Sequence, residues 1–273
     1  MTVATLAQVL RPALAERRAV AGLVVLGWED ACAYVAAAEA EGRPVILQAG
    51  PGCRRHMPLP VLGAMFRWLA ERASVPVVAH LDHGEGLDIC AQAIACGFTS
   101  VMYDGSALPL DQNADITAQV VALAHAAGVS VEAELGVVGY PGGAVSGATD
   151  PSQAAAMAAT GIDALAVSVG NSHLMEVADT VIDRARLAAI QMAVPGLPLV
   201  LHGGSGVARA LRRELARDTA ICKFNIGTEL RMAFGSALRA ALARDAARYD
   251  RNAILSDTIA PMTAAARQII AGL

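Results

Sequence analysis

The sequence is poor in aromatic and charged side chains. Aromatic residues make up 4% of its 273 residues and charged residues 17%, whereas hydrophobic residues make up 55%. The chain can therefore bury a sizeable core. Alanine is abundant, which favours many helices packed closely through small side chains.

Lysine is almost missing, and no cluster of basic residues occurs anywhere in the chain. Of the 21 basic residues only Lys223 is a lysine. The net charge of −4 and the pI of about 5.9 argue against a nucleic-acid-binding surface. No apolar stretch is long and uncharged enough to span a membrane. We therefore expect neither nucleic acid nor a membrane as a partner.

A cysteine pattern typical of metal or redox sites is also missing. The five cysteines are odd in number, and their spacings match no zinc or redox motif. The chain opens without a signal peptide. These features predict a cytoplasmic protein whose thiols are reduced and lie in the core.

Eight apolar segments alternate with helical patterns along the chain. We predict strands over residues 19–26, 43–48, 76–84, 99–103, 129–135, 164–170, 198–202 and 221–226. Helices are expected between them, before the first strand at 4–18, and after the last strand around 230–242 and over 256–271. Parallel strands need such long crossovers, and eight βα units match the size of a TIM barrel.

The predicted fold class is thus α/β, a TIM (β/α)8 barrel with an extra N-terminal helix and C-terminal helices, forming a single domain over 1–273. An open doubly wound sheet is the alternative, although no GxGxxG motif follows the first strand. The 136–149 segment holds five glycines and one proline. We expect it to be a long loop with a functional role.

Polar residues gather at the predicted carboxyl ends of the strands, where TIM barrels carry their active sites. Three apolar strands run into histidines, namely His83, His173 and His202. This coincidence predicts one metal ion with open positions for a substrate. In the third strand, alternation puts His80 and Asp82 on one side and Leu81 and His83 on the other. We interpret His80 as a hydrogen-bonded core residue and His125 as a surface residue.

Two glycine-containing loops follow the last two strands, at 203–206 and 225–228. TIM barrels often bind phosphate at these positions through backbone N–H groups and helix N-termini. Glycine lets the backbone approach a ligand closely, and the hydroxyl groups of Ser205 and Thr228 add donors. The sequence therefore predicts a phosphate site beside the metal.

These motifs resemble the class II (zinc-dependent) fructose-bisphosphate and tagatose-bisphosphate aldolases, with this chain a divergent member. The resemblance rests most on His-Leu-Asp-His-Gly at 80–84. Further similar blocks are Asp104-Gly-Ser106 with Leu108-Pro109 and Asn113, Val131 to Gly136, Thr149 to Pro151, Leu201 to Ser205, and Lys223 to Glu229. They cover most of the chain from residue 19 to 270.

The resemblance implies a ketose-bisphosphate aldolase, an aldehyde-lyase of carbohydrate metabolism and glycolysis. It would cleave a ketose phosphate to dihydroxyacetone phosphate and an aldehyde, or form the ketose phosphate from these two, through a zinc-stabilised enediolate. His83, His173 and His202 match the Zn²⁺ ligands, with Glu134 as a ligand in an alternative position. Asp82 matches the acid/base that protonates the aldehyde oxygen. The implied phosphate clamp comprises Leu174, Gly203, Gly204, Ser205, Asn225, Ile226, Gly227 and Thr228.

The resemblance further implies a monovalent cation (Na⁺ or K⁺) near the phosphate and a homodimer or homotetramer. The sequence also departs from the family pattern in three places. The 137–148 loop lacks the family's acidic residues, so Tyr140, Glu85 or Asp82 would have to remove the α-proton. Leu174 stands where glycine is usual. The first strand ends in Gly22-Leu-Val-Val-Leu-Gly27 without a polar side chain.

Three alternatives follow from these departures. The enzyme could use a non-standard acceptor aldehyde, and ordinary turnover of fructose 1,6-bisphosphate would argue against that reading. It could instead form a Schiff base between Lys223 and the substrate carbonyl. A barrel that binds metal and sugar phosphate without turnover, or with altered chemistry, is the third reading.

Overall fold

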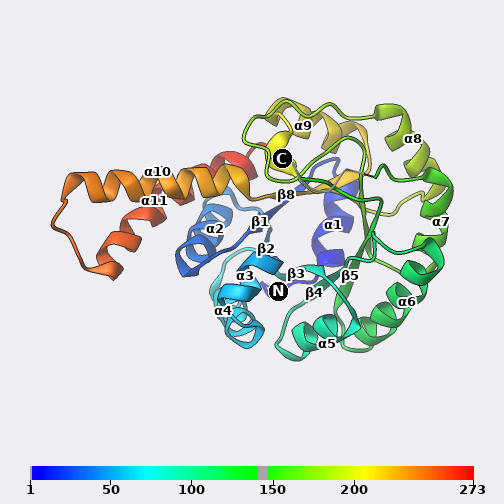
Figure 1. The fold of residues 1–273 in the computed structure, drawn as a ribbon, viewed down its shortest axis with the longest axis horizontal. Coiled ribbons are helices and arrows are strands. Elements are labelled where there is room, and N and C mark those ends of the chain that lie inside the picture. The colour runs from blue at the N-terminus through cyan, green and yellow to red at the C-terminus, as the bar shows by residue number, and fades with distance from the viewer. Residues whose placement is uncertain (1, 141–146) are drawn as a thin grey trace.

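The computed structural model describes residues 2–140 and 147–273, and within them eight strands close into a parallel barrel (Figure 1). The strands are β1 Val20–Val24, β2 Val45–Ala49, β3 Val77–Gly84, β4 Ser100–Tyr103, β5 Ser130–Leu135, β6 Ala164–Val167, β7 Leu199–Leu201 and β8 Ile221–Ile226. The barrel closes between the first and last strands, where Ala21 pairs with Phe224. The predicted fold class is confirmed.

The helices lie mainly around the outside of the barrel (Figure 1). The helices are α1 Leu6–Ala15, α2 Trp28–Glu41, α3 Pro51–His56, α4 Leu59–Arg72, α5 Leu87–Ala95, α6 Leu110–Ala126, α7 Pro151–Ala159, α8 Arg184–Ala193, α9 Arg209–Asp218, α10 Thr228–Arg244 and α11 Arg251–Ile270. A single turn of 3₁₀ helix, η1, spans Gly204–Gly206.

Several boundaries differ from the prediction for reasons of local hydrogen bonding. Strand β1 stops at Val24 because the Asp30 carboxylate accepts the next free N–H groups, those of Leu26 and Gly27, at 2.8 and 3.0 Å. α3 was not predicted, and Pro51 occupies its first turn, where a missing N–H costs nothing. α11 begins at Arg251, earlier than expected, because Asp250 caps it.

The segment predicted as a long functional loop lies partly outside the described residues, which omit 141–146. Its described ends come together, since Val137 and Gly147 exchange two backbone hydrogen bonds of 2.7 and 2.9 Å. Thr149 then joins the loop to the barrel by donating to the Leu135 carbonyl.

Helix α1 closes the amino-terminal end of the barrel. Leu6, Val9, Leu10 and Ala13 are buried on its inner face. They pack against inward-facing residues of several strands, namely Val20, Ile46, Val78, Ala164, Ala166, Val200 and Cys222. A capping box between Thr5 and Gln8 begins the helix. The barrel interior is therefore sealed with apolar groups at this end, and polar residues gather at the other.

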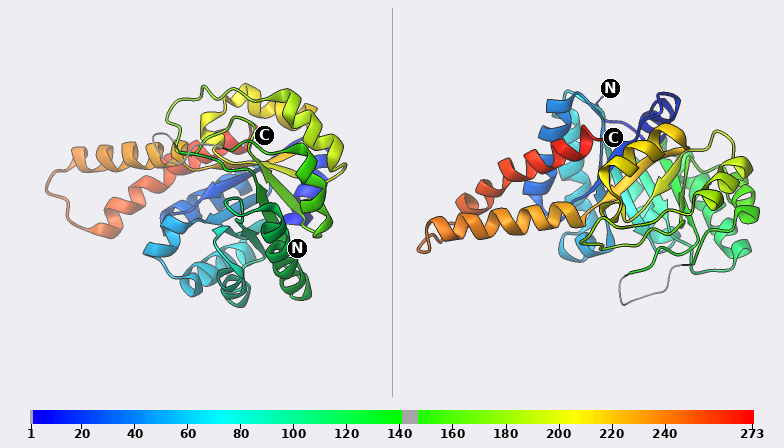
Figure 2. Two further views of the ribbon diagram at one scale, coloured as in Figure 1. Left: turned by 45° about the vertical axis from the view of Figure 1, so that its right-hand side comes forward. Right: turned by 90° about the horizontal axis from the view of Figure 1, so that it is seen from above.

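Helices α10 and α11 form a hairpin that extends away from the barrel (Figure 2). Near its base, α11 packs against α2 as well as α10. None of the described helices is both long enough and apolar enough to cross a membrane.

We predict that Leu10→Ala lowers the free energy of unfolding by about 2–5 kcal/mol, because it leaves a cavity beneath the barrel floor. Urea titration followed by circular dichroism would measure the loss. Leu123→Ala is the matched control, since Leu123 is 40% exposed on α6 and should change stability by no more than about 0.5 kcal/mol. Equal stability of the two variants would show that α1 is not part of the core.

Candidate metal centre and active site

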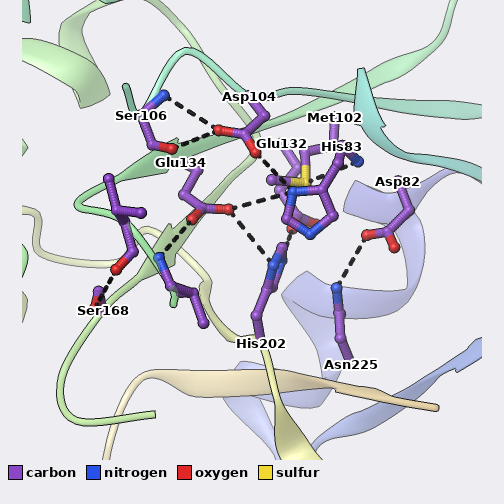
Figure 3. Close-up of polar contacts among 12 residues, drawn as sticks. Asp82, His83, Met102, Asp104, Ser106, Glu132, Glu134, Ser168, His202 and Asn225 are labelled. Atoms are coloured by element: carbon purple, nitrogen blue, oxygen red, sulfur yellow. Dashed lines mark hydrogen bonds and ion pairs between the residues drawn. The ribbon is translucent and has the colours of Figure 1, made fainter. Parts of the chain in front are cut away.

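Three histidines meet at the carboxyl end of the barrel (Figure 3 draws two of them). His83 belongs to β3, His173 follows β6 and His202 follows β7. One ring nitrogen of each lies within 4.8 Å of one ring nitrogen of the other two. Imidazole nitrogens are common ligands of transition metals, so these rings could hold one ion together.

An irregularity in β3 brings His83 to this centre. The pairing of β3 with β4 shifts register between Leu81 and Gly84, and His83 has a φ of 50°. Strict alternation would have put its side chain on the face opposite Asp82. The left-handed conformation breaks the alternation, so Asp82 and His83 line the same cavity. Such a conformation is costly for a residue other than glycine, and strained residues cluster at functional sites.

Carboxylates fix two of the imidazole rings, those of His83 and His202, by hydrogen bonds to one nitrogen of each (Figure 3). The Nδ1 atom of His83 donates to Asp104 at 2.7 Å, and Nε2 of His202 donates to Glu132 at 3.1 Å. Asp104 is itself fixed by the backbone N–H and hydroxyl of Ser106. Histidines that bind metals usually donate their other nitrogen to such a carboxylate. The pattern leaves Nε2 of His83 and Nδ1 of His202 as the candidate ligand atoms.

Two buried atoms beside the rings have no hydrogen-bond partner within the described chain. They are Nδ1 of His202 and Oε2 of Glu134, which lie 3.5 Å apart. Buried polar atoms are rarely left unpaired. Both atoms offer a lone pair, so a cation is the partner that fits both. His83, Asp104 and Glu134 form a second group with ligand atoms within 4.8 Å, consistent with the alternative position expected for Glu134.

Burial and neighbouring charges together shift the pKa values of these groups. Burial lowers the pKa of His83, but Asp82, Asp104 and Glu134 outweigh burial and raise it to about 10. Burial raises the pKa of Glu134 to about 8. By contrast, burial and the charge of His83 lower the pKa of His173 to about 4. A proton on His83 thus balances the carboxylates, and a divalent cation would balance them in its place.

A buried ion pair lies beneath the three rings. Lys223 donates to Glu132 at 2.6 Å, and both side chains are fully buried. His80 hydrogen-bonds to Ser100 at 2.8 Å through Nδ1, in line with its interpretation as a core residue. Its Nε2 lies 3.7 Å from Glu132. The single lysine is therefore held by the carboxylate that also orients His202.

Two amide side chains fix Asp82. Gln48 and Asn225 both donate to its Oδ1, at 3.0 and 3.1 Å. The side chain of Gln48 occupies the space above Gly22, where an added Cβ would lie 2.2 Å from the Gln48 amide oxygen. No described residue hydrogen-bonds to Oδ2 of Asp82, which leaves this atom for a ligand. Sequence reasoning missed Gln48, although a buried amide at a strand end was a readable signal.

The predicted phosphate clamp surrounds a small cavity next to Asp82. Its lining includes Leu174, Gly203, Ser205, Asn225, Gly227 and Thr228. Gly204 and Ile226 do not line it, although they lie close together, because an added Cβ on Gly204 would lie 3.1 Å from Cγ1 of Ile226. Gly203 must be glycine because its φ is 64° and an added Cβ would lie 2.0 Å from the Ser172 carbonyl oxygen. Leu174 has a φ of 55°, which explains why glycine would suit this position.

Arg231 is a further residue at this cavity that sequence reasoning missed. It lines the clamp cavity, and its guanidinium approaches Gly227, the residue before α10. The backbone N–H of Arg231 donates to the Gly227 carbonyl at 2.9 Å, but within the part of the chain that the structure describes its guanidinium forms no hydrogen bond or ion pair. Its position one turn after Gly227 was the available signal, since residues four apart share a helix face. It is an unpaired cation beside a site predicted to bind phosphate.

The candidate proton-transfer residues line a second, larger cavity of about 440 Å³ above the rings. Asp82, Glu85 and Tyr140 all reach it. Tyr140 also stacks on His173, with ring centroids 4.8 Å apart. All three groups that sequence analysis named as replacements for the missing loop acid thus face one space. His125, by contrast, lies away from the site; its side chain is exposed, in line with its interpretation as a surface residue, and pairs with the buried Asp163 at 2.9 Å.

Comparison with known proteins agrees with this geometry. The family model "Fructose-bisphosphate aldolase class-II" matches residues 4–273. Fructose-bisphosphate aldolase of Geobacillus stearothermophilus is 39% identical over 264 residues, covering 93% of this chain and 91% of that protein. The enzyme of Streptococcus pneumoniae serotype 4 is 38% identical over 241 residues, covering 86% and 80%.

A solved structure shares the arrangement as well. The crystal structure of the YdjI aldolase from Escherichia coli K12 superposes with a TM-score of 0.81 at 30% identity, covering 98% of this chain and 96% of that one. Because the family model spans nearly the whole sequence, the chain belongs to the class II fructose-bisphosphate aldolases and is a metal-dependent aldolase acting on a sugar phosphate.

Proposed function

We propose that the metal of this aldolase is zinc, and that the enzyme cleaves a ketose 1-phosphate to dihydroxyacetone phosphate and an aldehyde. The observation that supports this best is the pair of unpartnered buried atoms on His202 and Glu134, beside His83 and His173. Nitrogen ligands with open positions are typical of catalytic zinc. Zn²⁺ would supply Lewis acidity, making the proton beside the donor carbonyl acidic enough to remove at neutral pH.

Residues of the chain would bind the metal and the donor phosphate. His83, His173 and His202 hold the metal, with Glu134 able to bind it in another position. The clamp, from Gly203 to Ser205 and from Asn225 to Thr228, binds the donor phosphate through backbone N–H and hydroxyl groups. Arg231 adds a charged donor to the same phosphate.

Asp82 would act as the acid/base on the acceptor oxygen. In cleavage its carboxylate takes the proton from the hydroxyl on C4, and the oxygen left behind forms the aldehyde carbonyl. The C3–C4 bond breaks, and its bonding electron pair stays on the donor fragment. A protonated Tyr140, Glu85 or Asp82 then returns a proton to C3. Condensation runs the same steps in reverse. Gln48 and Asn225 hold Oδ1, so Oδ2 is the atom that transfers the proton.

A Schiff-base route through Lys223 finds no support in this geometry, because Glu132 binds its ammonium group in the barrel interior. Because the relatives are fructose-bisphosphate aldolases, fructose 1,6-bisphosphate is the first substrate to test. We further propose a homodimer or homotetramer and a monovalent cation near the phosphate. Sedimentation and K⁺ titration of activity would test these two proposals.

We predict that EDTA abolishes cleavage and that Zn²⁺ restores it, because the chain has no other Lewis acid for the donor carbonyl. His202→Ala should lower kcat/KM at least about a thousandfold and resist rescue by zinc, since its ring is fixed by Glu132 for this purpose. His125→Ala is the control and should behave like the parent. Full activity in EDTA, with inactivation by borohydride plus substrate, would instead support Lys223.

We also predict that zinc binding releases a proton near neutral pH. His83, with a pKa of about 10, must lose its proton to become a ligand, whereas His173, with a pKa of about 4, is already neutral. The apparent affinity for Zn²⁺ should therefore rise with pH, about tenfold per unit between pH 6 and 8. Calorimetry in buffers of different ionisation enthalpy would count the protons.

The matched variant for this prediction is Asp104→Asn. It removes a carboxylate that raises the pKa of His83, so the variant should release fewer protons and show a shallower pH dependence. Zinc affinity independent of pH in the parent protein would contradict the ligand role of His83.

We predict that Arg231→Met raises KM for the ketose phosphate about tenfold with little change in kcat, because a hydrogen bond to a charged group is worth about 1.5–3 kcal/mol when formed and binding would be lost uniformly. Steady-state kinetics would measure both constants. Arg239→Met, two turns further along α10, is the control and should leave KM unchanged. Equal constants in the two variants would remove Arg231 from the clamp.

A further inference from the structure

A third cavity, of about 360 Å³, opens at the end of β1 beside the candidate site. Its apolar lining consists of Val24, Leu26, Tyr34 and Phe234. Leu26 is 37% exposed there. Ligand sites in proteins commonly begin at this volume and are mostly apolar.

The polar atoms of the cavity wall are largely used within the wall itself. Asp30 accepts the N–H groups of Leu26 and Gly27, and the Tyr34 hydroxyl donates to the Val24 carbonyl at 3.3 Å. What the cavity offers to a ligand is therefore mainly apolar surface.

The cavity adjoins the catalytic space. It shares Val24, Leu26 and Arg231 with the larger cavity that Asp82, His83 and His173 line. The phosphate clamp, after β7 and β8, also borders this cavity, since its lining includes Val24 and Arg231 as well as Asp82. A substrate with its reacting carbon at Asp82 lies in a cavity that the ends of β1 and β2 also line. From there its remaining carbons can reach the apolar cavity past Val24 and Leu26.

The charges in this cavity disfavour a second phosphate. The cationic residue of its lining is Arg231, at the edge shared with the clamp, whereas Glu29 and Asp30 are both acidic. A phosphate placed deep in the cavity would lie near these carboxylates and would lose its hydration. An uncharged tail would instead bury apolar surface at no such cost.

We propose that this cavity binds the tail of the acceptor aldehyde, and that the preferred acceptor carries an unphosphorylated aliphatic or aromatic tail. The inference rests on the proposed function, because it assumes dihydroxyacetone phosphate as the donor. The apolar residues at the end of β1 would then contact the tail of the acceptor.

The test is condensation of dihydroxyacetone phosphate with propanal, butanal, pentanal, hexanal, glyceraldehyde and glyceraldehyde 3-phosphate, using the zinc-loaded protein. The kcat/KM of the alkanals should rise about fourfold for each added methylene until the cavity is full. Pentanal and hexanal should exceed glyceraldehyde 3-phosphate.

The diagnostic variant is Leu26→Asn, which keeps the backbone N–H bound by Asp30 and makes the cavity polar. The ratio of kcat/KM for hexanal to that for glyceraldehyde should fall about tenfold, as expected for losing apolar contact in a pocket. Leu123→Asn alters an equally exposed leucine on α6 and should leave the ratio unchanged.

Three outcomes would overturn the inference. A flat alkanal series with glyceraldehyde 3-phosphate as the best acceptor would overturn it while leaving the proposed function intact. A Leu26→Asn variant that loses activity equally with every aldehyde would do the same. If the parent protein also failed to exchange the C3 hydrogen of dihydroxyacetone phosphate with deuterium from solvent, the proposed function itself would fall.

Discussion

Buried negative charge at the mouth of the barrel is the constraint on which this site depends. Asp82, Asp104, Glu132 and Glu134 converge there, and Lys223 pairs with one of them. The remaining excess raises the pKa of His83 to about 10, so without a metal the site holds a proton where a cation would lie. The protein thus maintains an arrangement that is electrostatically costly by itself and that a divalent ion would relieve.

The barrel could be predicted because each of its signals is local. Apolar runs, glycine stops and the alternation of strands and helices are all visible in short windows, and the site residues followed from their places at strand ends. Two features of the site could not be predicted, because they depend on packing between residues far apart in the sequence. The bulge that turns His83 inward arises from pairing between β3 and β4. The contact of Gln48 with Asp82 requires the open space above Gly22 on a neighbouring strand. No local pattern encodes the bulge or the contact, although the amide of Gln48 is visible in the sequence as a polar residue at a strand end.

The two halves of the site differ in how closely they follow the family pattern. The half proposed to bind metal and phosphate keeps its histidines and glycine loops, and the one exception, Leu174, accepts a left-handed backbone in place of glycine. The half proposed to bind the acceptor has a β1 end without polar side chains and no acid in the 137–148 loop. A barrel allows this division because loops from different strands can change independently while the scaffold stays the same.

The burial of Lys223 determines how the protein reacts with reagents that modify lysine. It is the sole lysine of the sequence, and it is fully buried. Reagents or enzymes that acylate lysine would find no such amine on the folded surface. Acylation of Lys223 would instead report that the barrel has opened, so its rate would follow unfolding rather than surface exposure.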